Sequence, residues 1–313
     1  MITAEVILGL LYSSITLLTP LLLAGLAELL VERSGILNLS LEGTMLMGAF
    51  VAFMVAFYTG DLYYATLLAS IAGAVLCLLF AILTITLALD QMVTGLALNL
   101  LTIGITSYLY RASFGWYVSP IPPHIQTTLQ PIEIPVLSQI LVIGKILFSH
   151  LPHTYAAFVL VFLTWWLLFK TEKGLKIRAI GEDPQTADYL GINVNLTRYA
   201  LLILEGCIAG IAGSLLSIGY YNMFLDNMTQ GRGYIAIALI ILSRWNPLLL
   251  LGGAFLFSFI DALQLRIQAF NIPFLPYQFA LMLPYLFTIV LLFVAGRKVK
   301  GPASLAKPFK KLR

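Results

Sequence analysis

Long apolar segments separated by short polar stretches make up most of this 313-residue chain. A helix needs about 20 predominantly apolar residues to cross the hydrocarbon core of a bilayer, so the pattern predicts about nine transmembrane helices, with a range of about eight to ten. We therefore expect an all-α, polytopic integral membrane protein with a single transmembrane domain over residues 1–313. The expected spans are Ile7–Ala27, Thr44–Tyr58, Tyr63–Leu89, Met92–Tyr110, Thr154–Phe169, Tyr199–Ile218, Tyr234–Ser243, Leu248–Leu265 and Phe279–Ala295.

Two polar stretches interrupt the pattern where a helix would otherwise continue. The first is Gly35–Gly43 (GILNLSLEG), in which Asn38, Ser40 and Glu42 alternate with leucines. The second is the triplet Gly231–Gly233, which precedes a short apolar segment. Non-helical backbone is tolerated at membrane depth only where it is buried in protein or lines a polar cavity. Both breaks are thus predicted to interrupt helices inside the bundle, and their weak likeness hints at the inverted repeats found in transporters.

Basic residues indicate which ends of the spans face the cytoplasm. Four of them fall within Lys170–Arg178, and the tail Arg297–Arg313 is also basic, so both are expected on the cytoplasmic side. The first belongs to a coupling loop of about residues 170–198, and counting five spans backwards from it places the N-terminus outside and the C-terminus inside. The proline-rich stretch Arg111–His153 then becomes a long external loop, in which Val136–Phe148 is expected to be interfacial or re-entrant.

The cytoplasmic loop carries the start and stop signals of a short helix. Asp183 suits the N-cap, Pro184 the first helical position, and Gly191 the left-handed position after the last turn. Ala187 and Leu190 lie three residues apart and are expected to share an apolar face. Such a helix is suited to docking on a soluble partner, but ordinary ordered loops contain similarly capped helices.

Polar residues also occur inside the predicted spans, where each must pair, protonate or face water. The residues concerned are Asn99, Glu205 and Asp261. One interpretation is that they line a polar path. The other is that they pair with Arg232, Arg266 or one another and fix the bundle, a role that the nearby Arg266 favours for Asp261.

Small residues form a face on the span Tyr199–Ile218. Gly206, Gly210 and Gly213 are spaced so that a neighbouring backbone can approach them closely. Packing within one subunit is the expected use of this face, in preference to a contact between subunits.

Composition agrees with a membrane protein and excludes several functions. Hydrophobic residues make up 60% of the chain, charged residues only 10%, and the mean hydropathy is +0.95, whereas soluble domains carry about 25% charged residues. The net charge of +4 is explained by the cytoplasmic segments, so no nucleic-acid partner is expected. No P-loop motif or catalytic constellation occurs, and His150 and His153 lack a third metal ligand. The chain is expected to hold no metal or cofactor and not to be an enzyme.

Five stretches together resemble the permeases of ABC transporters in the branched-chain amino acid and sugar permease family. Within that family, the chain is most similar to the nucleoside permease branch that works with basic-membrane-protein lipoproteins. Sugar-type relatives carry Asp-Leu-Ser where this chain has Asn38-Leu39-Ser40, which favours nucleosides over monosaccharides. The stretches are Glu32–Phe50, Asp90–Leu101, Gly174–Val194, Gly231–Ala238 and Arg244–Pro247.

The resemblance implies a permease similar to those of type II importers, in a bacterial inner membrane. Two permease subunits, identical or homologous, would sit on two ATPase subunits that bind the ATP, and an extracytoplasmic lipoprotein would deliver the solute. The ATPase-coupling residues that it implies are Arg178, Gly181, Asp183, Pro184, Ala187, Leu190 and Gly191. The candidates for the translocation path are Asn38, Ser40, Glu42, Asn99, Glu205, Asn227 and Arg232.

Two alternatives stay open at this point. Within the same class, the cargo would be a sugar or a branched-chain amino acid instead of a nucleoside. In a different class, the chain would be a secondary transporter driven by an ion gradient. Glu205 and Asp261 would then carry protons or sodium ions.

Overall fold

The computed structural model describes residues 4–115, 122–133, 143–269, 277–295 and 300–309. Among these residues, seven helices are long and apolar enough to cross a membrane. They are α1 (Ala4–Arg33), α2 (Leu41–Thr59), α3 (Leu62–Ala81) with the π-helix η1 (Ile82–Thr86), α4 (Gln91–Phe114), α6 (Pro152–Lys170), α9 (Val194–Ser214) with the π-helix η3 (Leu215–Tyr221), and α11 (Pro247–Ala269).

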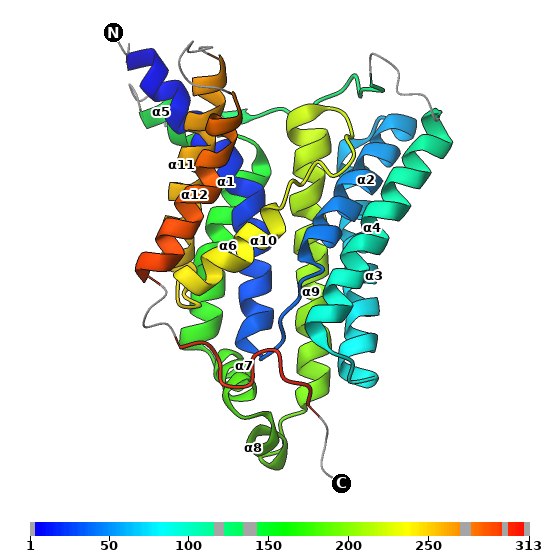
Figure 1. Cartoon of the computed structure of the whole chain (residues 1–313), viewed down its shortest axis with the longest axis vertical. Coiled ribbons are helices and arrows are strands. Elements are labelled where there is room, and N and C mark those ends of the chain that lie inside the picture. Colours follow the sequence, from blue (N-terminus) through cyan, green and yellow to red (C-terminus); the bar gives the residue numbers. More distant parts are fainter. Residues whose placement is uncertain (1–3, 116–121, 134–142, 270–276, 296–299, 310–313) are drawn as a thin grey trace.

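Two further apolar helices complete the bundle. One is α10 (Arg232–Leu242), and the other is α12 (Tyr277–Ala295), with its apolar part at Leu281–Val290. Together with the seven long helices they correspond to the nine segments expected from the hydrophobic pattern. The all-α class is therefore confirmed (Figure 1).

The remaining elements are short and lie at the two ends of the bundle. The segments α5 (Ile143–Leu147), β1 (Ile132–Glu133) and β2 (Ser149–His150) follow α4, and β1 and β2 pair antiparallel. Within the predicted interfacial segment Val136–Phe148, residues 136–142 lie outside the described residues. The loop that was predicted to be cytoplasmic contains α7 (Glu172–Glu182) and α8 (Pro184–Tyr189). Figure 1 shows α5 and the start of α1 at one end, and α7 and α8 at the other.

Polar residues at the predicted turns act as helix caps. The Oδ1 atom of Asp61 accepts hydrogen bonds of 3.0 Å from the first two backbone N–H groups after Leu62. Asp90 caps α4 in the same way, at 2.9 Å from the N–H of Val93. These side chains satisfy N–H groups that a helix start leaves without partners, which fixes where α3 and α4 begin.

Close backbone contacts place α9 at the centre of the bundle. A Cβ atom on Gly206 would collide with the backbone of Gly73 in α3, and one on Gly213 would collide with the backbone of Met45 in α2. Gly210 likewise packs against Ala69 of α3. The expectation that these glycines serve packing within one subunit is confirmed, since all three contacts are made inside the chain.

The end predicted for the first span was wrong. The helix α1 does not stop at Ala27 but continues to Arg33, so Glu28 and Glu32 lie inside it and are fully buried. Glu28 accepts a 3.0 Å hydrogen bond from the backbone N–H of Asn38, and Glu32 accepts one of 2.5 Å from the indole of Trp245. Distant partners therefore bond to one oxygen of each carboxyl group, and no local pattern reveals them.

Three other helix boundaries also differ from the prediction. The Gly35–Gly43 break ends early because α2 begins at Leu41. The stretch Arg266–Gln278 is not all loop, because α11 continues through Arg266 to Ala269. The helix α7 occupies a part of the cytoplasmic loop for which no helix was predicted, where Thr171 caps it by accepting a 3.1 Å hydrogen bond from the N–H of Gly174.

Gly213→Ala is expected to lower the stability of the purified protein by about 1–3 kcal/mol, because the added methyl group must push α9 away from the backbone of α2. Gly104→Ala in α4 is the matched control, since a Cβ there would meet no atom within 4 Å. This control should be neutral or slightly stabilising. Thermal unfolding in detergent compares the two variants, and equal Tm values would contradict the close contact.

Candidate translocation and coupling sites

The carboxylate of Glu42 joins the two breaks. Its Oε1 atom accepts hydrogen bonds of 2.7 Å from the N–H of Gly231 and 2.5 Å from the hydroxyl of Thr229. Its Oε2 atom accepts one of 2.7 Å from the N–H of Gly233. Gly231 has a φ of +81°, which places α10 immediately after a left-handed turn, and Glu42 is only 2% exposed. The first turn of α2 thus supplies a buried anion to the N-terminus of α10, where backbone N–H groups and the helix dipole favour negative charge.

Asn99 lies beside this junction. Its Nδ2 atom donates a 2.6 Å hydrogen bond to the hydroxyl of Tyr234, in the first turn of α10. A Cβ on Gly43 would come within 3.1 Å of the Oδ1 atom of Asn99, so α2 and α4 touch here. The structure therefore brings Asn99 and Glu42 together around the start of α10.

Asn38 occupies a separate buried cluster between α1 and α9. Its Nδ2 atom donates a 3.0 Å hydrogen bond to Glu205, and its own N–H donates to Glu28. Its Oδ1 atom accepts from the N–H and the hydroxyl of Ser40, at 2.9 and 2.5 Å. All four side chains are fully buried. Asn38, Ser40 and Glu205 thus meet in the structure, and they lie inside the bundle with no side-chain exposure.

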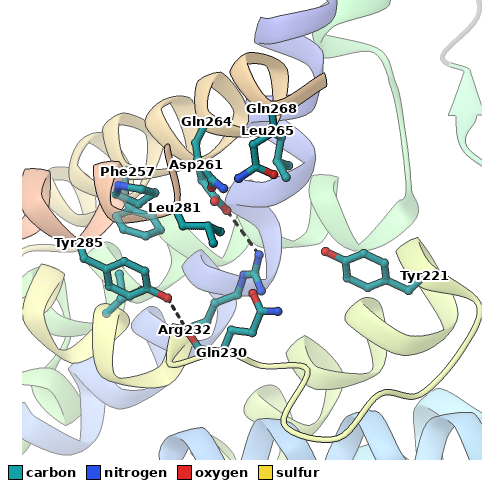
Figure 2. Close-up of a pocket in the computed structure, with 12 residues that line it drawn as sticks. Tyr221, Gln230, Arg232, Phe257, Asp261, Gln264, Leu265, Gln268, Leu281 and Tyr285 are labelled. Atoms are coloured by element: carbon teal, nitrogen blue, oxygen red, sulfur yellow. Dashed lines mark hydrogen bonds and ion pairs between the residues drawn. The ribbon is translucent and has the colours of Figure 1, made fainter. Parts of the chain in front are cut away.

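Asp261 forms an ion pair with Arg232 at 3.4 Å, so its predicted structural pairing is confirmed. The partner is Arg232 and not the nearby Arg266 that the sequence favoured. Arg232 and Asp261 lie on the wall of a polar cavity between α10, α11 and α12 (Figure 2). Asn227 is in the loop before α10, is exposed, and has a left-handed φ of +55°. The structure therefore separates Arg232 and Asn227 from the Asn38 cluster.

The predicted cytoplasmic helix is present as α8. Asp183 caps it by accepting hydrogen bonds from the N–H groups of Gln185 and Thr186, at 3.0 and 3.1 Å. The hydroxyl of Thr186 also donates to Asp183, and these bonds hold the pKa of Asp183 below its usual value. Pro184 begins the helix, and Gly191 follows its last turn with a φ of +83°. Because the pKa is lowered, the cap stays ionised at neutral pH and is lost only as the pH falls through that depressed value.

The shared face expected for Ala187 and Leu190 is wrong. Ala187 is 2% exposed and packs against Ile180 and Val194, whereas Leu190 is 76% exposed. The helix α8 already ends at Tyr189, so Leu190 lies in the turn leading to α9 and is exposed. Tyr189, which is 74% exposed, accompanies Leu190 at the surface.

Arg178 and Gly181 lie on α7 and face the membrane domain. The guanidinium of Arg178 sits 5.3 Å from the ring centre of Phe169, at the end of α6. A Cβ on Gly181 would collide with the carbonyl oxygen of Arg33, the last residue of α1. These two residues therefore connect α7 to the spans, and their role in coupling stays a prediction.

The C-terminal segment 300–309 was missed as part of this region. Ser304 donates to the carbonyl of Gly181 through its N–H and its hydroxyl, at 2.9 and 2.6 Å. The N–H of Ala306 donates to the carbonyl of Gly35 at 3.2 Å, and Phe309 packs on the cluster around Ala187. Its basic composition indicated a tail surrounded by solvent. The apolar and small residues between its lysines could have indicated that the segment packs on the protein. The segment connects α7 and α8 to the first break.

Glu42→Ala is expected to destabilise the protein by about 1–3 kcal/mol for each buried N–H that loses its acceptor. Asp61→Ala is the matched control, because Asp61 also accepts from two backbone N–H groups but at an exposed position where water can replace it. The control should cost only about 1 kcal/mol. Thermal unfolding of both variants in detergent measures the difference, and an equal loss of stability would contradict the role of Glu42 as a buried cap.

Comparison with known proteins agrees with this architecture. A 16% identical solved structure, described as "An inward-facing conformation of a putative metal-chelate type ABC transporter", superposes with a TM-score of 0.52 over 91% of this chain and 85% of that one, which shows a shared fold. A guanosine ABC transporter permease of Bacillus subtilis is 34% identical, with 93% of this chain and 92% of the relative aligned.

Two more relatives and a family model extend the similarity. A nucleoside ABC transporter permease of Lactococcus lactis is 33% identical over 91% of both chains. A protein of Haloferax volcanii named "Putative glucose ABC transporter permease protein" is 38% identical over 84% of this chain and 79% of its own length. The family model described as the permease component of branched-chain amino acid transport systems matches residues 10–295. The chain therefore belongs to the family of branched-chain amino acid transport system permease components.

Proposed function

We propose that the chain is the membrane-spanning subunit of an ATP-driven nucleoside importer, and that α8 docks on a separate ATPase subunit. Family membership supports the role of a permease, and relatives named for guanosine and for nucleosides align over at least 91% of this chain. The chain itself would hydrolyse no ATP and hold no cofactor.

The exposed end of α8 carries this proposal. Tyr189 and Leu190 are 74% and 76% exposed, although both are large and apolar. They lie at the end of the molecule where the long apolar helices stop, so lipid does not account for them (Figure 1). Adjoining exposed apolar side chains at such a place are typical of a protein contact. Beneath them, Ala187 is buried against Ile180, which would let the surface transmit a push to the membrane domain.

Orientation follows from the same arrangement. The N-terminal end of α1 lies opposite α8 and the described C-terminal segment (Figure 1). The basic stretch Lys170–Arg178 lies at the α8 end, and this supports a cytoplasmic position for α8 and the C-terminus and an outside position for the N-terminus. The membrane would be a bacterial inner membrane. A second permease subunit and a solute-binding lipoprotein would complete the importer.

The two breaks would form the moving part of the translocation path. Glu42 links the starts of α2 and α10, and Asn38 links the first break to α9. Polar groups of this kind, buried inside a helical bundle, mark solute pathways in transporters. Alternating access would then require rearrangement around these bonds when ATP binding moves α8.

A sugar is the second candidate cargo. The Haloferax volcanii relative named for glucose is 38% identical to this chain, more than the two relatives named for nucleosides. Family membership does not favour the third possibility, a carrier driven by an ion gradient. Glu205 is bonded to Asn38 and Asp261 to Arg232, so both acids have fixed partners inside the bundle.

Tyr189→Ala combined with Leu190→Ala should weaken ATPase binding at least about tenfold, because each large apolar side chain contributes ~1.5–3 kcal/mol when buried and ~1.4 kcal/mol is a factor of ten. ATP-driven uptake should fall accordingly while the permease stays inserted. Copurification with the ATPase and uptake in proteoliposomes are the measurements.

The matched control for this pair is Tyr63→Ala with Tyr64→Ala, which also removes two exposed apolar side chains, from the first turn of α3. The control complex should assemble and transport normally. Full ATPase copurification by the α8 variant would contradict docking at this surface.

Cargo is tested with the reconstituted complex of permease, ATPase and binding protein. Radiolabelled guanosine should accumulate on addition of ATP, and D-glucose and L-leucine should not. Accumulation of glucose alone would show that the cargo is a sugar and not a nucleoside. Accumulation that follows an ion gradient without ATP would show that the chain is not part of an ATP-driven importer.

A further inference from the structure

A polar cavity of ≈ 190 Å³ lies between α10, α11, α12 and the end of η3. Its lining includes neither Glu42 nor any residue of the Asn38 cluster. Figure 2 shows polar side chains entering it from all sides, with the hydroxyl of Tyr221 pointing across towards Arg232. The lining residues that the argument uses are Tyr221, Gln230, Arg232, Asp261, Gln264 and Gln268.

Two of these groups neutralise each other. Arg232 and Asp261 form the 3.4 Å ion pair, and their side chains are only 10% and 16% exposed. A lone charge at this depth would be costly, whereas the pair leaves the cavity with no net charge. A cavity of this kind suits a neutral ligand better than an ion.

Two other groups have no partner in the part of the chain that the structure describes. Gln264 is 5% exposed, and its amide makes no hydrogen bond there. The Nε2 atom of Gln268 is buried and also without a partner. The buried, unpaired Nε2 atom of Gln268 costs about 1–3 kcal/mol. Because the cavity provides no protein partner for them, these amides are available to a hydrogen-bonding ligand.

The position of the cavity suits a solute that arrives from outside. Asp261 lies 14 residues beyond Pro247, the first residue of α11, which is about 21 Å at ~1.5 Å per residue. The start of α11 is tied to the cytoplasmic end of α1, since Arg33 donates a 2.9 Å hydrogen bond to the carbonyl of Trp245. The cavity is therefore in the half of the bundle that is remote from α8.

The chemistry of the walls defines the class of ligand. A carboxamide donates and accepts hydrogen bonds side by side, which matches neighbouring hydroxyl groups on a ring. Tyr221 and Tyr285 add aromatic faces against which a ring can pack. The volume of ≈ 190 Å³ corresponds to roughly six waters at ~30 Å³ each, room for one hydroxylated ring but not for a drug-sized molecule.

We propose that this cavity is a subsite for the hydroxylated sugar ring of the transported solute, bound by the amides of Gln264 and Gln268. The inference rests on the proposed import function and adds the group of the cargo that this chain itself recognises. Gln230 and Arg232 flank Gly231, whose N–H is held by Glu42. A ring bound in this subsite thus touches the residues on either side of Gly231. Binding of the ring therefore acts directly on the junction of the two breaks.

The first experiment compares two proteins. One is a double variant that carries both Gln264→Leu and Gln268→Leu, and the other is the control variant Gln278→Leu. Gln278 is an exposed residue of α12 that does not line the cavity, which makes it a control of the same chemistry. Both proteins are reconstituted with their ATPase and binding protein, and uptake of radiolabelled guanosine and thermal unfolding are measured.

The subsite predicts at least a tenfold loss of uptake by the double variant, with a Tm equal to or above that of the unaltered protein. Leucine at an unpaired amide position costs no hydrogen bond, so stability should not fall. Uptake within twofold of the control would overturn the subsite, and so would a loss of uptake that follows a loss of stability. If the unaltered complex imports no guanosine, glucose or leucine, the import function fails instead.

A labelling experiment tests the subsite without relying on uptake. Gln264→Cys is made together with Cys207→Ala, which leaves the buried Cys77 as the other thiol. A membrane-impermeant methanethiosulfonate is added from outside to the full complex, with or without guanosine, ribose or glucose.

Labelling should be at least threefold slower with guanosine. Protection by ribose but not glucose would identify the pentose of a nucleoside as the ligand, and protection by glucose would identify a free hexose. No labelling, or labelling that none of the three solutes slows, would overturn the subsite.

Discussion

One buried carboxylate holds together the two helices that are broken inside this permease. A helix that starts within a membrane leaves N–H groups without partners, and each costs several kcal/mol in hydrocarbon. Glu42 accepts from the N–H groups of Gly231 and Gly233, at 2.7 Å each, although it belongs to a different helix. The helix α10 can therefore begin where it does only while the start of α2 stays beside it. The two breaks form one structural unit. Movement of one break must either move the other with it or break these hydrogen bonds.

Hydrogen bonds across the chain also connect the cytoplasmic helices to this unit. Ser304 bonds to the carbonyl of Gly181 in α7, and Ala306 bonds to the carbonyl of Gly35 at the start of the first break. Gly181 itself touches the last residue of α1. Short, direct contacts thus run from α7 to the first break. From Asn38 in that break, a further hydrogen bond leads to Glu205 in α9.

The sequence predicted what local chemistry determines. Apolar length located the seven long helices and the two shorter apolar ones among the described residues. Asp183, Pro184 and Gly191 predicted α8, because caps act on neighbouring residues. Partners distant in the sequence could not be read in this way. Glu28 and Glu32 looked like the end of a span until Asn38 and Trp245 supplied their hydrogen bonds. Ala187 looked free to dock until the C-terminal segment covered it. For the site, the candidate residue types were predictable, but their division into the Asn38 cluster, the Glu42 cap and the Arg232 cavity was not.

Asn38 and Gln264 are both buried, but their amides are bonded very differently. Asn38 uses its amide, its carbonyl oxygen and its backbone N–H within the bundle, so it has little left to offer a solute unless the first break rearranges. Gln264 is nearly as buried, yet its amide bonds to no described residue. The Nε2 atom of Gln268, which lines the same cavity, is buried and unpaired, so a hydrogen-bonding ligand would stabilise it. We therefore assign the bonded Asn38 and Glu42 to the junction of the two breaks, and we propose the cavity lined by Gln264 and Gln268 for the cargo.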